Sequence, residues 1–190
     1  FPEEAGSPGA WGTNINLPLL PGTGDEGLHR LYDGLISHIL EDFKPELIIN
    51  SAGQDNHFSD PLASMAVTAQ GYARLADKLQ ADIAVLEGGY SVESALPYVN
   101  TGIILAMAGM DYSKVLEPDI SELRKQDPRC NKRVDQLIEQ VGNLYFNRES
   151  TKKELLQKCN GVWQRKKHIY YDEEGIREQQ VETIRYCNSC

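Results

Sequence analysis

Two short apolar runs, separated by one amphipathic stretch, constrain the fold of this chain most strongly. Residues 47–52 and 83–86 have the length and composition of strands, and residues 68–79 between them carry apolar side chains at helical spacing. A helical pattern over residues 25–43 precedes the first run, and another over residues 92–110 follows the second. Strands that alternate with helices predict a parallel sheet with right-handed crossovers, and continuous apolar runs are typical of strands buried on both faces. The chain is therefore predicted to have an α/β fold.

Local signals place the ends of these elements. Thr23 and Glu26 have the spacing of a capping box for the first helix, and Thr68 can cap the second. Residues 14–19 resemble a third short strand. Three strands would leave much of a parallel sheet uncovered, and the chain begins at Phe1 rather than methionine, so further strands are expected from sequence that is not present here.

The last third of the chain has a different character. A charged amphipathic helix is predicted over residues 130–147, and a β-hairpin over residues 167–186 with a turn at 172–175. We therefore predict two domains, an α/β part over residues 1–112 and an extension of unknown role over residues 113–190.

Composition limits the classes of function. The formal charge of −9 argues against a general nucleic-acid binder or an anionic-membrane binder, although residues 165–168 form a short basic run. No stretch approaches the roughly 20 apolar residues of a membrane span. The four cysteines imply no disulfide framework, so a cytoplasmic location is expected. Cys187 and Cys190 have the spacing of half a structural zinc site, and incidentally spaced free thiols are the alternative.

The loop after the first apolar run carries three groups that can bind a metal. Asp55, His57 and Asp60 follow directly on that run, at the sheet edge where ligands collect in open α/β folds. Side chains two residues apart in an extended segment share a face, so a local zinc site is one interpretation. The other is that Asp55 binds loop amides while His57 lies at the surface.

A second glycine-rich segment, Glu87-Gly88-Gly89-Tyr90, follows the next apolar run. Consecutive glycines allow the backbone to approach a ligand closely. A neutral phenol at Tyr90 could polarise a carbonyl group and stabilise an oxyanion. A simple turn followed by a packed tyrosine is the alternative.

Taken together and in order, these segments resemble the second half of the histone deacetylase family, which includes the acetylpolyamine amidohydrolases and the acetoin-utilisation proteins. The resemblance covers about residues 6–110. It rests on Asn14-Ile15-Asn16-Leu17-Pro18-Leu19, Gly24-Asp25, Ser51-Ala52-Gly53-x-Asp55-x-His57-x-x-Asp60-Pro61-Leu62, Thr68, Gly71 and Glu87-Gly88-Gly89-Tyr90.

The resemblance implies a role for several residues. Asp60 is similar to the family's second zinc aspartate, and Tyr90 to the tyrosine that polarises the acyl carbonyl. Gly88, Gly89 and Val67 resemble residues that line the acyl-lysine tunnel. Asp55 and His57 then become supporting groups around the metal rather than ligands. The family's other two ligands, an Asp-x-His, and its His-His acid/base pair lie on upstream segments that are absent from this chain. Gln54 departs from the family pattern, where an aromatic residue or alanine is more usual, and is expected to change packing rather than chemistry.

The resemblance also implies a fold, a cofactor and partners. It implies part of an arginase/deacetylase-like parallel sheet sandwiched by helices, with a C-terminal helical and β-hairpin appendage. It implies zinc or another divalent metal, and it allows a structural potassium ion. The expected partners are an acylated amine substrate, the missing N-terminal half of the domain, and a second copy in a homo-oligomer. Two alternatives stay open: a non-catalytic fragment that acts by assembly, and an unrelated α/β binding domain, which a large separation of Asp60 from Tyr90 would favour.

Overall fold

The structure is a computed structural model that describes residues 2, 4–118, 120, 125–159, 161–171 and 174–185. It divides into two compact units. One consists of Pro18–Glu139, and the other joins Phe1–Leu17 to Gln140–Cys190. Cys187 and Cys190, with their predicted half-site for zinc, lie outside the described residues.

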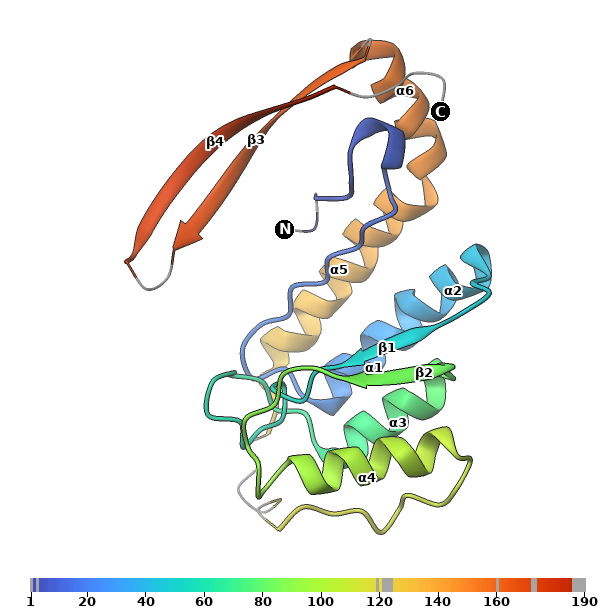
Figure 1. Cartoon of the computed structure of the whole chain (residues 1–190), viewed down its shortest axis with the longest axis vertical. Coiled ribbons are helices and arrows are strands. Elements are labelled where there is room, and N and C mark those ends of the chain that lie inside the picture. Colours follow the sequence, from blue (N-terminus) through green and yellow to red (C-terminus); the bar gives the residue numbers. More distant parts are fainter. Residues whose placement is uncertain are drawn as a thin grey trace. The chain divides into compact units, whose positions relative to one another are not determined.

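A parallel pair of strands lies at the centre of the first unit, as predicted (Figure 1). β1 (Ile49–Ala52) pairs with β2 (Ile83–Leu86), so that Ile49 lies opposite Ile83 and Ala52 opposite Leu86. The crossover between them contains α3 (Ala69–Leu79), and α4 (Leu96–Met107) follows β2. Small side chains let these elements approach closely, because the core combines Ala52 with alanines of both helices and with Val99 and Ile103. The unit is therefore an α/β fold.

The helix predicted over residues 25–43 is confirmed, with an irregular middle. It runs as α1 (Asp25–Leu31), a π-helical turn η2 (Tyr32–Ile36) and α2 (Ser37–Phe43). The predicted capping box is wrong. Gly24 is the N-cap, and the Thr23 hydroxyl donates to the carbonyl of Leu20 instead. The side-chain oxygen of Gln126 accepts from the N–H groups of Gly24 (2.7 Å) and Gly27 (3.3 Å), so a distant amide caps this helix.

The strand predicted over residues 14–19 is also wrong, since these residues adopt no regular secondary structure. A strand needs a neighbour for its backbone groups, and in the part of the chain that is described β1 and β2 pair only with each other. The side chains of Asn14 and Asn16 instead donate to the backbone carbonyl of Glu4. A short 3₁₀ turn, η1 (Pro8–Ala10), precedes this segment.

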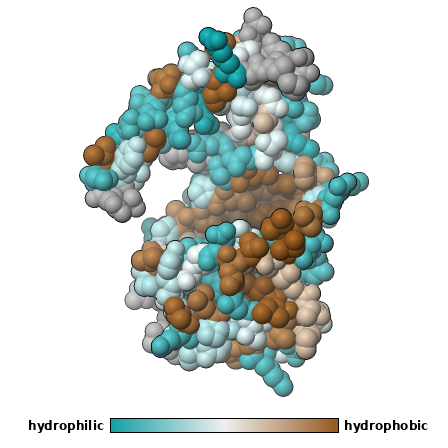
Figure 2. Space-filling model, in the orientation of Figure 1, coloured by the Kyte–Doolittle hydropathy of each residue, from teal (hydrophilic) through white to brown (hydrophobic). Residues whose placement is uncertain are grey.

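The prediction that both strands are buried on both faces is wrong for this chain. Ile49 is 56% exposed and Leu86 is 72% exposed, and Leu47, Ile83 and Val85 are exposed as well. Figure 2 shows apolar side chains gathered on the surface over this region. The strand composition is typical of a sheet that is covered on both faces, but among the described residues β1 and β2 form a sheet of two strands whose side chains are largely exposed.

The C-terminal part contains the predicted helix and hairpin. The helix is α5 (Pro128–Phe146), and the hairpin consists of β3 (Val162–Tyr171) paired antiparallel with β4 (Ile176–Arg185). A further helix, α6 (Arg148–Cys159), was not predicted, because its few apolar residues do not gather on one face.

The hairpin divides the basic run at residues 165–168 between its two faces, because successive side chains of a strand point to opposite sides. Arg165 and Lys167 share a face with Glu182, and the Arg165–Glu182 ion pair measures 2.7 Å. Lys166 and His168 lie on the other face. The run is therefore not one continuous basic patch. No helix within the described ranges is both long enough and apolar enough to cross a membrane.

Candidate functional site

Asp60 lies in the loop that follows β1 and is held there through its carboxylate. Its Oδ1 accepts from the N–H of Leu62 (2.9 Å) and of Ala63 (3.3 Å), and its Oδ2 accepts from the N–H of Tyr90 (2.8 Å). Burial by itself raises the pKa of Asp60, but the backbone hydrogen bonds, that from Tyr90 first, hold the pKa below its usual range. The side chain is thus a fixed, ionised carboxylate.

Tyr90 lies beside Asp60, in the loop that follows β2. The hydrogen bond from its N–H to Asp60 joins the loop after β1 to the loop after β2, and a contact of 2.9 Å between the Ser59 and Ser91 hydroxyls joins the same two loops. The Tyr90 side chain is 52% exposed. Tyr90 and the Asp60 carboxylate therefore lie close together in the loops after β1 and β2, which removes the condition that would favour an unrelated α/β domain.

His57 has both ring nitrogens occupied by protein groups. The N–H of Ser59 donates to Nδ1 (3.2 Å), so the ring proton is on Nε2, which faces Oε1 of Glu117 at 3.3 Å. The ring is completely buried. Within the described ranges, no group of three His, Cys, Asp or Glu side chains could hold a metal ion. The local three-ligand site considered from the sequence is thus not formed.

Asp55 packs against the two glycine segments. A Cβ added at Gly88 would lie 2.7 Å from Oδ2 of Asp55, and a Cβ at Gly53 would lie 3.3 Å from its Oδ1. Gly89 has a φ of 143° and would bring a Cβ to 2.9 Å from Gln54. Within this chain the glycines at 88 and 89 are therefore required by the packing of the neighbouring loop, and their predicted place in a substrate tunnel stays a prediction.

Gln54 and Val67 are both buried around this loop. The Gln54 amide donates to the side-chain oxygen of Asn100 on α4, which fits the expectation that this residue affects packing. Val67 forms a parallel bridge with His57 and belongs to the apolar core. Its side chain is covered in this unit, and the tunnel-wall role implied by the resemblance stays a prediction.

Three further residues of the family motif, Asp25, Thr68 and Gly71, contact one another at the N-terminus of α3. Asp25 accepts from both the N–H (2.8 Å) and the hydroxyl (2.6 Å) of Thr68, and Thr68 caps α3 as predicted by accepting from the N–H of Gly71 (3.0 Å). A Cβ at Gly71 would lie 2.0 Å from Oδ1 of Asp25. Burial raises the pKa of Asp25. Asp25 thus binds the N-terminus of α3 through Thr68, and its carboxyl group fills the space that the missing side chain of Gly71 leaves.

Several residues of the site were not singled out from the sequence. Glu117 contacts His57 from a segment 60 positions further along, and Asn100 contacts Gln54 from 46 positions away. Tyr72, which the helical pattern predicts on the inner face of α3, is buried nearby, where burial and the charge of Asp55 raise its pKa. Each contact joins distant segments, and a single sequence carries no signal for such a pairing.

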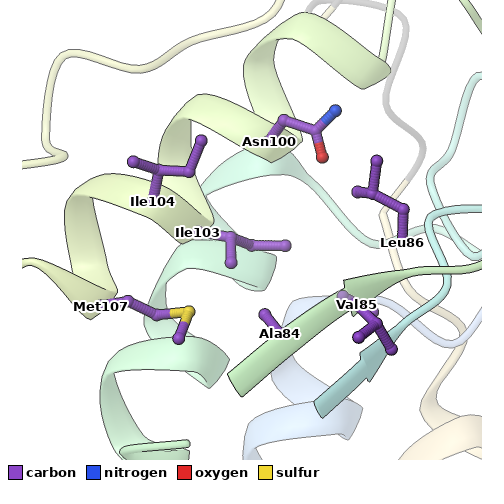
Figure 3. A pocket seen from close by; sticks show the side chains of 8 residues that line it. Ala84, Val85, Leu86, Asn100, Ile103, Ile104 and Met107 are labelled. Atoms are coloured by element: carbon purple, nitrogen blue, oxygen red, sulfur yellow. The ribbon is translucent and has the colours of Figure 1, made fainter. Parts of the chain in front are cut away.

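A pocket of about 390 Å³ lies between β2 and α4 (Figure 3). Its wall is apolar apart from Asn100, and the side chains of Leu86, Ile103 and Ile104 project around it. Leu86, Ile104 and Met107, all of which line it, are among the exposed large hydrophobic residues. The pocket thus continues the exposed apolar surface of the sheet.

Comparison with known proteins identifies the family of this chain. Residues 1–106 match the histone deacetylase domain family. A probable deacetylase of Archaeoglobus fulgidus is 50% identical over 140 residues, which are 67% of this chain and 39% of that protein. The acetoin utilization protein AcuC of Bacillus subtilis is 32% identical over 136 residues, covering 66% of this chain and 35% of its own. The crystal structure of the HDA15 HD domain superposes with a TM-score of 0.63 at 24% identity, covering 83% of this chain and 42% of that one.

The class of protein follows from the fold and the match: an arginase/deacetylase-like α/β protein. This chain belongs to the histone deacetylase family. It spans about two fifths of the length of the archaeal relative, at 39%.

Proposed function

We propose that this chain is part of a zinc-dependent deacetylase that removes acyl groups from amines. The observation that carries the proposal is the hydrogen bond between the Tyr90 N–H and the Asp60 carboxylate, because it joins the residue that resembles the family's carbonyl-polarising tyrosine to the one that resembles its zinc aspartate. The names of the relatives, a probable deacetylase among them, support a deacetylase-type activity.

Asp60 would supply one ligand of the metal. The three backbone hydrogen bonds to its two oxygens leave part of its acceptor capacity free, since a carboxylate has about four lone-pair positions. An anionic carboxylate in a fixed orientation suits zinc or another divalent cation. A zinc ion in such a site supplies a Lewis acid and an activated water.

Tyr90 would orient the acyl group of the substrate. Its phenol is exposed at the sheet edge while its backbone is fixed by Asp60, so the hydroxyl can donate to a carbonyl oxygen without rearrangement of the loop. The substrate class is an acylated amine, either a small molecule or an acetylated lysine.

The remaining ligands would come from a part of the deacetylase domain outside this chain. A single carboxylate does not hold zinc tightly. Two observations support completion by further strands: the apolar strands are exposed, and the relatives extend well beyond the matched segment. The isolated chain is therefore expected to be non-catalytic. Its cysteine usage supports a reducing compartment such as the cytoplasm.

A reconstitution experiment tests this proposal. The chain is co-expressed with the part of the archaeal relative that lies upstream of the matched segment, and hydrolysis of an acetylated lysine peptide is measured with zinc. Activity is expected with the wild-type chain. Tyr90→Phe should lose most of kcat while the bound zinc is retained, and Tyr98→Phe, on α4, is the matched control. Full activity of the Tyr90 variant would remove this residue from the mechanism.

A second set of variants tests the apolar surface. Leu86→Glu and Ile104→Glu place charges in the pocket between β2 and α4, where each side chain is already exposed in the isolated chain. Both variants should fold alone but fail to assemble with the upstream part, as measured by co-purification. Glu41→Gln on α2, an exposed position, is the control. Assembly of both pocket variants at wild-type yield would contradict this use of the surface.

A further inference from the structure

Glu117 is a buried carboxylate that lies beyond residues 1–106, the segment that matches the family model. It follows α4, beyond the matched residues 1–106, and is only 2% exposed. Acidic side chains are rarely this buried unless they are hydrogen-bonded to a partner. Its position therefore calls for specific partners.

Those partners belong to two different parts of the site. Oε1 of Glu117 lies 3.3 Å from Nε2 of His57, which carries the ring proton, and accepts from the N–H of Ala69 at 3.1 Å. Ala69 is the first residue of α3. One carboxylate oxygen thus joins the loop after β1 to the N-terminus of the crossover helix, where the helix dipole favours a negative charge.

His57 passes this restraint on to Asp60. The carbonyl of His57 accepts the N–H of Asp60 (3.0 Å), and the N–H of His57 donates to the carbonyl of Gln54 (3.1 Å). The next residue, Phe58, donates its N–H to Val67 (3.1 Å). His57 therefore connects Glu117 to the backbone of the loop that carries Asp60.

The contacts of Oε1 favour the ionised form of Glu117, whereas its Oε2 is buried without a hydrogen-bond partner among the described residues. Burial raises the pKa of Glu117, but the hydrogen bonds from His57 and from Ala69 outweigh it and hold the pKa below its usual range. Removal of the carboxylate would leave the buried Nε2–H of His57 without an acceptor, which costs more than the hydrogen bond itself contributes.

We propose that Glu117 is a positioning residue for the metal-ligand loop: it holds His57 against the start of α3 and so fixes the backbone that carries Asp60. The inference rests on the proposed role of Asp60 as a ligand. It extends the site into the segment after α4, which the family match does not include.

The test uses the chain by itself, with Glu117→Leu and Glu117→Gln. Native-state hydrogen exchange of the Asp60 and Tyr90 amides is compared with that of the Ala76 amide in α3. In Glu117→Leu, the two loop amides should exchange at least about tenfold faster relative to Ala76. Glu117→Gln keeps an acceptor for His57 and should bring their exchange back to within about threefold of wild type. The ¹⁵N spectrum of His57 should show a slowly exchanging Nε2–H in the wild type and lose it only in the Leu variant.

Ile103→Ala is the matched control, because it removes a buried side chain of the same core without touching the loop. It should accelerate the loop and α3 amides together. The proposal would be overturned if Glu117→Leu and Ile103→Ala changed the exchange of the loop amides relative to Ala76 equally. It would also be overturned if these amides exchanged as fast in Glu117→Gln as in Glu117→Leu. Because the measurement needs neither metal nor substrate, its failure is distinct from a failure of the deacetylase proposal, which would appear as lost zinc or activity in the reconstituted domain.

Discussion

Replacement of Gly71 by alanine should have opposite effects on stability in two backgrounds. In the wild-type chain the added Cβ would lie 2.0 Å from Oδ1 of Asp25, and the three heavy atoms nearest to it all belong to the Asp25 carboxyl group. The carboxyl group must therefore move, and its two hydrogen bonds to Thr68 must break. Without that carboxyl group, the three closest contacts of the added Cβ are removed.

The magnitude follows from these contacts. Burial raises the pKa of Asp25, so we take the low end of the range for hydrogen bonds to charged groups, about 1.5 kcal/mol each. Two such bonds give about 3 kcal/mol, and alanine offsets this by about 1 kcal/mol through its higher helix propensity. Gly71→Ala should thus destabilise the wild type by about 2 kcal/mol and stabilise Asp25→Ala by up to about 1 kcal/mol.

The assay is a double-mutant cycle measured by hydrogen exchange of α3 amides in low urea. This probe reports on the unit that contains the mutations, which matters because a chain with two compact units need not unfold in one step. A coupling energy of about 3 kcal/mol is expected. Equal destabilisation by Gly71→Ala in both backgrounds would refute the steric account of this motif.

Three further predictions concern the loops and the titratable groups. Gly88→Ala should destabilise the chain by about 1–3 kcal/mol in urea unfolding, because the added Cβ would meet Oδ2 of Asp55. Asp55→Ala should relieve most of that loss of stability, and an undiminished loss in the double variant would contradict the predicted clash. Burial, with the charges of Arg74 and Lys78, lowers the pKa of His29 to about 4. The free energy of unfolding should therefore fall as the pH decreases from about 6.5 to about 4, and His29→Gln should flatten that part of the curve of stability against pH. Asp60 has a lowered pKa, so its contribution to the stability of the fold is complete above about pH 4 and is lost as the pH falls further. Asp60→Asn should be less stable than wild type at pH 7 and should lose less stability below about pH 4. Parallel curves of stability against pH for the two proteins would contradict the assigned hydrogen bonds.

The elements that follow from local patterns could be predicted from the sequence. β2 was placed at residues 83–86 and Thr68 was identified as a helix cap, because strand composition and capping depend on neighbours in the sequence. The adjacency of Asp60 and Tyr90 follows from the parallel order of the strands that precede them.

The failures share a physical cause, which is dependence on distant groups. Thr23 was expected to cap the first helix, but Gln126, about a hundred positions away, does so. A strand at residues 14–19 needs a neighbouring strand, and burial of β1 and β2 on both faces needs complete covering layers. The described residues provide no such neighbour and cover the two strands only in part. Glu117 was missed for the same reason, since its partner His57 is far away in the sequence.

Zinc binding tests the central claim most directly. The claim is that this chain contributes Asp60 as one ligand of a site that the rest of a deacetylase domain completes. We expect one zinc per reconstituted domain, weak or no binding by the isolated chain, and a loss of affinity of at least roughly a hundredfold in Asp60→Ala, as measured by competition with a chelator. Tight one-to-one binding by the isolated chain, or unchanged affinity of the Asp60→Ala domain, would contradict the account.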